Sequence, residues 1–314
     1  MTAVTVDRET IAQARRRIAS DLRATPLWRL PGTALGLPVA EVWLKLEQLQ
    51  IGGSFKARGM FNRLRSAVIP AAGAVIASGG NAGIAAAAAA RALGVPCEVF
   101  LPEISSPAKR QALAELGARV VVEGAQYVDA LAACLRRQAQ SGALLMHAYD
   151  QAEVVAGAGT LAAEIEEQGG GLPDRILVSV GGGGLIAGIA AWVAGRKRVE
   201  ALEPRGAPTL HAALAAGEPV DVAVSGLAAD ALGARRIGSI AWPICQRFVA
   251  AAHLLDDTAI RDAQRLLWRD FRLAVEPAAA LPLAALRSGA LRPERHERVA
   301  MVLCGANLDP ASLT

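Results

Sequence analysis

Lys56 lies in the stretch GGSFKARG, residues 52–59, directly after two glycines, a serine and a phenylalanine. The amine of a lysine can form a Schiff base with the aldehyde group of a bound molecule. Taken alone, an exposed lysine at the start of a helix is the simpler interpretation of this stretch. A chemical role for Lys56 is therefore indicated only if other motifs of the chain form a binding site for such a molecule.

The stretch VSVGGGGLIAGIAAW, residues 178–192, predicts a strand, a loop of four glycines and a helix. Glycines let backbone N–H groups converge on an anion, and the start of a helix adds the positive end of its dipole. A tight strand–helix turn is the alternative, but four consecutive glycines cost more chain entropy than such a turn requires. We therefore predict a phosphate site, which is not a P-loop because no Lys-Ser/Thr pair follows.

A second strand–loop–helix unit contains SGGN, residues 78–81. Asn81 is suited either to cap the following helix or to hydrogen-bond a hydroxyl group of a cofactor. In the second interpretation, backbone N–H groups of this loop bind the carboxylate of a substrate. A phosphate site together with a reactive lysine favours pyridoxal phosphate (PLP), which joins an aldehyde to a phosphate group.

Short apolar segments alternate with alanine-rich helical segments along most of the chain. Strands are expected at 73–77, 96–102, 119–123, 143–148, 174–180, 198–204 and from 298, and helices at 82–93, 105–118, 125–139, 151–168, 185–194 and 256–271. This alternation predicts an α/β fold whose parallel sheets are covered by helices on both faces. The four strands within 73–147 predict a small domain, and residues 1–72 and 148–314 would form a large PLP-binding domain. The loops SGGN, GGGG and CGAN (304–307) follow strands, and ligands of such sheets bind at the carboxyl ends of strands.

Composition excludes several classes of protein. Hydrophobic residues make up 53% of the 314 residues and charged residues 20%, which predicts a sizeable core without extended disorder. The net charge is only +4, arginines are dispersed and aromatics are 4%, so no nucleic-acid surface is expected. The four cysteines and four histidines are scattered, which argues against disulfides and zinc sites. No apolar run of about 20 residues predicts a membrane span, and we expect a soluble, cytoplasmic protein.

The motifs GSFKARG, SGGN, VGGGGLIAG, VEPAAA and CGAN occur in the order seen in the fold-type II PLP enzymes, and the chain resembles that family over nearly its whole length. The resemblance is strongest to the serine/threonine dehydratase branch, which includes serine racemase. It implies two open, twisted parallel-sheet domains of the tryptophan synthase beta type, with PLP in the cleft between them. It also implies a homodimer.

The resemblance implies a role for each matching residue. Lys56 would hold PLP as a Schiff base, Phe55 would pack beside the ring, and Asn81 would hydrogen-bond the 3′-oxygen. Glu276 would lie near the ring, although it could equally cap the helix that follows it. The phosphate would be bound by backbone N–H groups of Gly181, Gly182, Gly183, Gly184 and Leu185. The substrate carboxylate would be bound by Ser78, Gly79, Asn81 and Ala82.

The same resemblance places Cys304 at the pyridine nitrogen of PLP. A thiol is a weak hydrogen-bonding partner and would leave the ring largely neutral. A neutral ring suits β-elimination, in which the electrons leave with the β-hydroxyl group, better than it suits transamination. A buried strand cysteine without such a role is the alternative.

These features predict a dehydratase (ammonia-lyase) that converts L-serine, L-threonine or a similar small β-hydroxy amino acid to a 2-keto acid and ammonia. The freed Lys56 amine would remove the Cα proton. The alternatives are elimination on hydroxyaspartate, phenylserine or diaminopropionate, a serine racemase, and a non-catalytic PLP-binding protein. Racemisation is disfavoured because Gly79 stands where serine racemase carries a serine that serves as the second base.

The stretch LEPRGAPTLHAAL, residues 202–214, resembles the cation site of this branch. Glu203 would supply its side chain, Ala207 its carbonyl and Thr209 a further oxygen. Oxygen ligands suit K⁺, Mg²⁺ or Ca²⁺. A surface glutamate at the end of a strand is the alternative interpretation.

Overall fold

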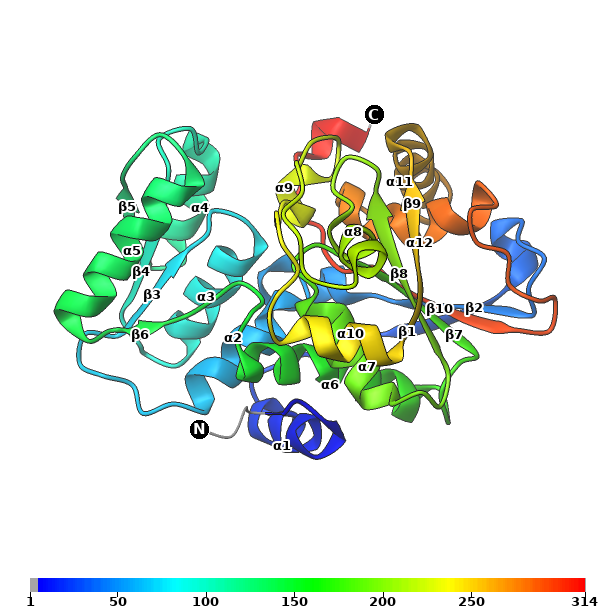
Figure 1. The fold of residues 1–314 in the computed structure, drawn as a ribbon, viewed down its shortest axis with the longest axis horizontal. Helices are drawn as coiled ribbons and strands as arrows, with labels where there is room; N and C mark the ends of the chain where they lie inside the picture. Colours follow the sequence, from blue (N-terminus) through cyan, green and yellow to red (C-terminus); the bar gives the residue numbers. More distant parts are fainter. Residues whose placement is uncertain (1–4, 314) are drawn as a thin grey trace.

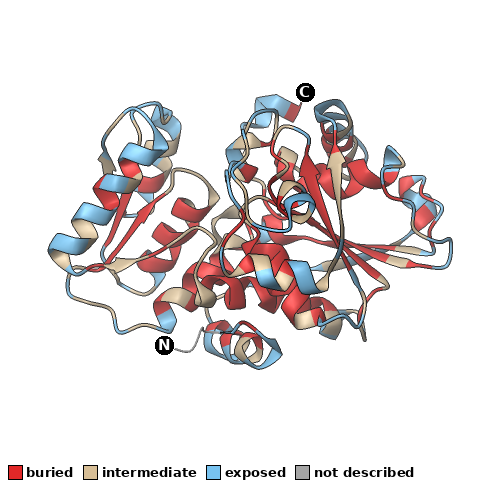
Figure 2. Ribbon diagram, in the orientation of Figure 1, coloured by how far each residue is buried: buried red, intermediate tan, exposed pale blue. Residues whose placement is uncertain are grey.

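The computed structural model describes residues 5–313, so the ends of the predicted large domain, residues 1–4 and 314, lie outside the described residues. Two sheets lie side by side, each between layers of helices (Figure 1). Buried residues follow the strands of both sheets, while exposed residues lie on the outer faces of the helices (Figure 2). The predicted α/β class with two open sheets is confirmed. The residue limits of the two domains stay a prediction.

The smaller sheet has four parallel strands in the order β5-β4-β3-β6. They are β3 (Ala74–Ala77), β4 (Cys97–Leu101), β5 (Arg119–Val122) and β6 (Leu144–Leu145). Alternate residues of β3 face opposite sides: Ile76 packs with α3 (Asn81–Ala92) and α4 (Pro107–Glu115), whereas Val75 packs with α5 (Tyr127–Ser141). Every side chain of β3 is therefore buried, as expected for a central parallel strand.

The larger sheet has six strands in the order β1-β2-β10-β7-β8-β9. They are β1 (Leu27–Pro31), β2 (Glu41–Lys45), β10 (Arg298–Val302), β7 (Arg175–Ser179), β8 (Arg198–Pro204) and β9 (Val249–Leu255). Only the pairing of β1 with β2 is antiparallel among the described strands. One layer contains α1 (Arg8–Ile18), α2 (Lys56–Arg65), α6 (Ala152–Gln168), α7 (Gly184–Val193) and α10 (Ala241–Phe248), and the opposite layer contains α11 (Asp257–Phe271) and α12 (Pro277–Arg287).

The shorter elements connect these layers. They are η1 (Gly32–Leu35), η2 (Glu47–Leu49), η3 (Ile51–Gly53), α8 (Thr209–Ala216), α9 (Ala229–Leu232) and η4 (Pro310–Leu313). Within residues 5–313, none of the helices has both the length and the apolar character that a membrane span requires.

Most expected elements occur within two or three residues of their predicted bounds, and one expected strand needs correction. Of the strand expected at 143–148, only Leu144 and Leu145 form a strand, β6, which pairs with β3. The chain turns after this point, where a ring nitrogen of His147 accepts the backbone N–H groups of Tyr149 and Asp150. The start of α11 has two aspartates, Asp256 and Asp257, of the residue type that commonly caps helices. Asp256 occupies the N-cap position but makes no capping bond, and its carboxylate pairs with Arg205 instead.

Candidate active site

Lys56 is the first residue of α2, directly after a tight turn. Gly52 and Gly53 in this turn have φ angles of 69° and 72°, which favour glycine. The turn is held to the end of β10 because the backbone N–H of Phe55 donates to the carbonyl of Cys304 at 3.0 Å. The Lys56 Nζ donates to the carbonyl of Ala148 at 2.7 Å. Burial lowers the pKa of Lys56 to about 8, so roughly a tenth of its amine is uncharged at pH 7, far more than for an ordinary lysine.

The helix that carries Lys56 is anchored by buried charges. The Arg58 guanidinium donates to both carboxylate oxygens of Glu47 at 2.7 and 2.8 Å, and to Glu164 of α6 at 3.1 Å. Lys45 of β2 also pairs with Glu164. Two cations and two anions therefore neutralise one another below α2. This cluster joins α2 to the large sheet and to α6, which holds the start of the helix in place.

The four glycines form the loop between β7 and α7. Gly183 has a φ of 87°, and α7 begins at Gly184 without a side-chain cap, so the N–H groups of its first turn have no intrahelical acceptor. The ring of Tyr149 lies against the loop: a Cβ added at Gly182 would approach it to 2.4 Å. The absence of side chains therefore lets the loop fold under Tyr149 while its N–H groups remain available to an anion.

Asn81 and Glu276 face each other across the cleft. The Asn81 Nδ2 donates to both carboxylate oxygens of Glu276 at 2.9 Å. Asn81 is the first residue of α3 and follows the N-cap residue Gly80, so the helix-cap interpretation of Asn81 is wrong. Glu276 does occupy the N-cap position of α12 but makes no capping bond. Burial raises the pKa of Glu276 to about 7.

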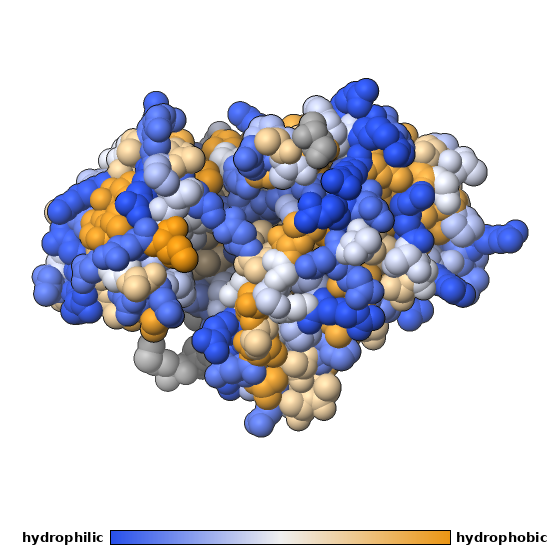
Figure 3. Space-filling model, turned by 90° about the horizontal axis from the view of Figure 1, so that it is seen from above, coloured by the Kyte–Doolittle hydropathy of each residue, from blue (hydrophilic) through white to orange (hydrophobic). Residues whose placement is uncertain are grey.

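One cleft brings together all the residues that were predicted to contact the cofactor. Its lining includes Phe55, Lys56, Asn81, Gly181, Gly182, Gly183, Gly184, Leu185, Glu276 and Cys304. The surface is hollowed between the two lobes of the molecule (Figure 3). Cys304 is almost completely buried, and this burial raises the pKa of its thiol well above the usual value. The thiol is thus neutral over the physiological pH range.

The residues predicted to bind substrate lie at the carboxyl end of β3, beside the cleft. Ser78 and Gly79 are half-buried, and Ala82 is buried in the first turn of α3. Of this set, only Asn81 belongs to the lining of the cleft.

Sequence reasoning missed several residues of the cleft, namely Tyr149, Ser179, Ala231 and Leu232. Tyr149 follows the expected strand 143–148, and its place after a strand end was the available signal. Ser179 is the last residue of β7, and its hydroxyl donates to the carbonyl of Ala278. The two residues of α9 come from a loop whose path the sequence pattern does not reveal.

Glu203 is the penultimate residue of β8 and is completely buried. Its two carboxylate oxygens accept the backbone N–H groups of Leu210 and His211 at 2.7 and 2.8 Å. The surface interpretation of Glu203 is therefore wrong. No side-chain cation among residues 5–313 pairs with it, and burial raises its pKa to about 7. The hydroxyl of Thr209 donates to the carbonyl of Ala234 at 2.9 Å. The carboxylate thus lies at the start of α8 without a cationic side-chain partner, and it is an oxygen ligand of the kind that a hard cation prefers.

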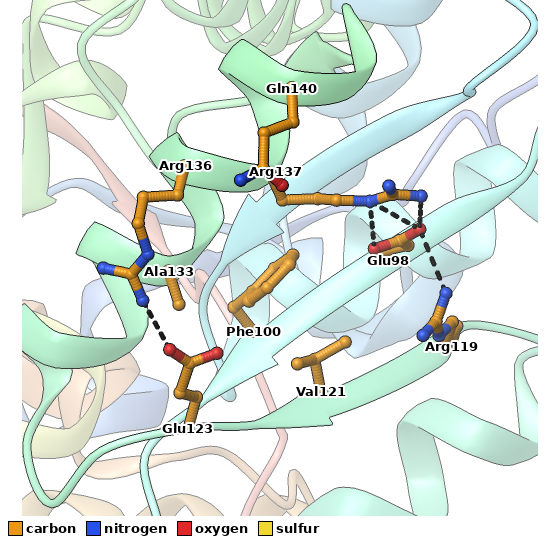
Figure 4. A pocket seen from close by; sticks show the side chains of 9 residues that line it. All are labelled: Glu98, Phe100, Arg119, Val121, Glu123, Ala133, Arg136, Arg137 and Gln140. Atoms are coloured by element: carbon orange, nitrogen blue, oxygen red, sulfur yellow. Dashed lines mark hydrogen bonds and ion pairs between the residues drawn. The ribbon is translucent and has the colours of Figure 1, made fainter.

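A second hollow, of about 240 Å³, lies on the small sheet between α5 and β5 (Figure 4). It contains none of the residues predicted for the site. Its charges pair internally: Arg137 and Arg119 contact Glu98, and Arg136 contacts Glu123. The chemistry-bearing residues thus belong to the cleft around Lys56.

The cleft fits the separate parts of PLP. A buried amine of lowered pKa suits the aldehyde, and a helix start with free N–H groups suits the phosphate. A buried neutral thiol and an amide suit the polar atoms of the ring.

Comparison with known proteins agrees with this fit. Residues 18–305 match the family described as pyridoxal-phosphate dependent enzyme. The chain is 35% identical to phenylserine dehydratase of Ralstonia pickettii, over 98% of this chain and 94% of that protein. It is 36% identical to an L-threonine ammonia-lyase of Geobacter sulfurreducens, over 89% of this chain and 70% of that protein. The structure of maize serine racemase superposes with a TM-score of 0.91 at 29% identity, covering 98% of this chain and 96% of that one. The chain belongs to the family of pyridoxal-phosphate-dependent enzymes of fold type II.

Proposed function

We propose that this protein is a PLP-dependent dehydratase (ammonia-lyase) that releases a 2-keto acid and ammonia from L-serine, L-threonine or a similar small β-hydroxy amino acid. The observation that carries the proposal is the buried Lys56 amine, with a pKa of about 8, in one cleft with the glycine loop and the loop that ends in Asn81. The names of the relatives, a phenylserine dehydratase and an L-threonine ammonia-lyase, support the same reaction type.

Each part of the cleft has one task in this proposal. The glycine loop binds phosphate, and the backbone at Ser78, Gly79, Asn81 and Ala82 binds the substrate carboxylate. The amine of Lys56 takes the proton from Cα, for which a pKa of about 8 is well matched to neutral pH. When bound, PLP supplies the electron-withdrawing ring that makes this proton acidic. The neutral thiol of Cys304 keeps a negative charge away from the ring nitrogen.

Elimination on a different β-substituted amino acid, such as phenylserine, hydroxyaspartate or diaminopropionate, is the second candidate. The similarity to phenylserine dehydratase over 98% of the chain favours it. The α9 segment contributes Ala231 and Leu232 to the lining of the cleft. Racemisation is disfavoured because Gly79 has no side chain to carry a proton.

The remaining parts of the proposal concern the whole protein. We propose a cytoplasmic homodimer with no nucleic-acid or membrane partner. Residues 73–147 would form the small domain. A cation, K⁺, Mg²⁺ or Ca²⁺, would bind at Glu203, Ala207 and Thr209, where it would offset the buried carboxylate.

The test is keto acid release from a panel of L- and D-serine, L-threonine, phenylserine, hydroxyaspartate and diaminopropionate by the PLP-loaded protein. The Lys56→Ala variant should release none. The matched control is Lys197→Ala, whose lysine pairs with Asp174 away from the cleft. Keto acid release by the wild type and by Lys197→Ala, but not by Lys56→Ala, supports elimination. The substrate with the fastest release then identifies the enzyme. Bound PLP without release from any substrate would refute the proposal.

A further inference from the structure

Asn307 closes the CGAN motif and had no assigned role. It lies just after β10, and it contacts three segments of the site at once. Its side-chain Nδ2 donates to the carbonyl of Gly52 at 2.8 Å and to the Oδ1 of Asn81 at 2.6 Å. Its backbone N–H donates to the carboxylate of Glu276. Asn307 thus joins the turn before Lys56, the start of α3 and the start of α12.

These contacts determine which way two amide groups face. A backbone carbonyl can only accept, so the atom of Asn307 beside Gly52 must be its nitrogen. The second hydrogen of that nitrogen then requires the oxygen of Asn81 on the other side. The nitrogen of Asn81 is consequently directed at Glu276, to which it donates twice at 2.9 Å. The chain of donors therefore runs in one direction, from Asn307 through Asn81 to Glu276.

The turn at Gly53 makes room for this arrangement. A Cβ at Gly53 would lie 2.7 Å from the Oδ1 of Asn307, and the φ of 72° also disfavours other residues. The backbone N–H of Ala306 donates to the carbonyl of Gly53 at 2.9 Å. Asn307 is therefore held by the same turn that places Lys56.

We propose that Asn307 is a positioning residue that fixes the Asn81 amide with its nitrogen toward the cofactor site. Without Asn307, the Asn81 oxygen loses this donor, and only the contact of the Asn81 nitrogen with Glu276 is left to orient the amide. The inference rests on the proposed role of Asn81 in binding PLP. It assigns no contact between Asn307 and PLP itself.

The test compares the full-length chain with Asn307→Asp, which has the same shape but replaces the side-chain donor by a negatively charged acceptor. The dissociation constant of PLP, measured by fluorescence titration of the cofactor-free protein, should rise about tenfold, the effect of one hydrogen bond. The pH at which the visible absorbance of bound PLP changes should shift by about one pH unit for the same reason. A residue that only stabilised the fold would leave this pH unchanged.

Two further variants make the test specific. In the Asn81→Ala background, Asn307→Asp should have no additional effect on PLP affinity, because Asn307 acts through Asn81. Asp309→Asn, which alters a side chain bonded to Ala311 two residues further on, should behave as wild type. An unchanged dissociation constant in Asn307→Asp, or a full effect that persists in the Asn81→Ala background, would overturn the inference. Failure of wild type to bind PLP would instead contradict the proposed function.

Discussion

Replacing Arg58 by glutamine tests whether buried charge holds the helix of Lys56. Arg58 is 2% exposed, and Glu47, which it contacts through two hydrogen bonds, is 0% exposed. Removal of one partner of a buried ion pair leaves the other charge without compensation, which typically costs about 3–5 kcal/mol. Lys45 cannot replace the lost cation, since it pairs with Glu164. We therefore expect Arg58→Gln to lower the free energy of unfolding by about 3–5 kcal/mol.

The assay is urea unfolding of the cofactor-free protein, followed by far-ultraviolet circular dichroism. Arg65→Gln is the matched control, because Arg65 lies on the same helix and its half-exposed guanidinium pairs with Asp21. Its loss should be smaller, because solvent reaches the guanidinium of this pair. A second test adds Glu47→Gln to Arg58→Gln, which removes the uncompensated charge.

The double variant should be more stable than Arg58→Gln alone, since two neutral amides replace an isolated buried anion. The reasoning is refuted if Arg58→Gln costs no more than Arg65→Gln. It is also refuted if the added Glu47→Gln change brings no recovery, because the loss would then not arise from an unpaired charge.

Three other predictions concern the cleft and the cation site. The rate at which PLP attaches to the cofactor-free protein should rise about tenfold per pH unit and level off above about pH 8, because only the uncharged Lys56 amine reacts. A rate that continued to increase up to about pH 10 would contradict the lowered pKa of Lys56. Gly182→Ala should weaken PLP binding at least about tenfold, since the new Cβ would lie 2.4 Å from the ring of Tyr149; an unchanged affinity in a fluorescence titration would argue against the loop geometry. K⁺, Mg²⁺ or Ca²⁺ should raise the Tm more at pH 8 than at pH 6, because the Glu203 carboxyl, with a pKa of about 7, is mostly protonated at the lower pH. Glu203→Gln should abolish the difference, and an equal response in that variant would locate the cation elsewhere.

The sequence predicted those parts of the site that are formed by residues consecutive in the chain. The glycine loop is recognisable because a strand, four glycines and a helix are consecutive in the chain, and β8 has the predicted bounds, Arg198–Pro204. The strands β1, β2 and β9 were not predicted. The strand β1 contains Trp28 and Arg29 on exposed positions, and β9 contains three alanines in a row, so neither has a clear strand pattern. The strand β2 is a short, largely buried segment, EVWLK, that was missed although its residues suit a strand.

Contacts between distant residues could not be predicted. Asn307 and Asn81 are 226 positions apart, and Arg58 and Glu164 are 106 positions apart. Each pair meets only because the strand order brings β10 beside β2 and places α6 against α2. The lowered pKa of Lys56 and the raised pKa of Glu276 both follow from burial, which also arises only when distant segments meet. A motif shows which groups are present, while their protonation is a property of the assembled cleft.

The alanine-rich helix α3 bears on how the cleft changes width. Its buried residues Ala85, Ala86, Ala87, Ala88, Ala89 and Ala90 include the surface that packs on α2, the helix that begins with Lys56. Side chains this small form only shallow ridges on α3, and Met60, Phe61 and Leu64 of α2 share one core with them. Small sliding movements of packed helices are one way in which a cleft between two sheets changes its width. A larger side chain on this face of α3 would therefore be felt by the helix that begins with Lys56, and so by the width of the cleft.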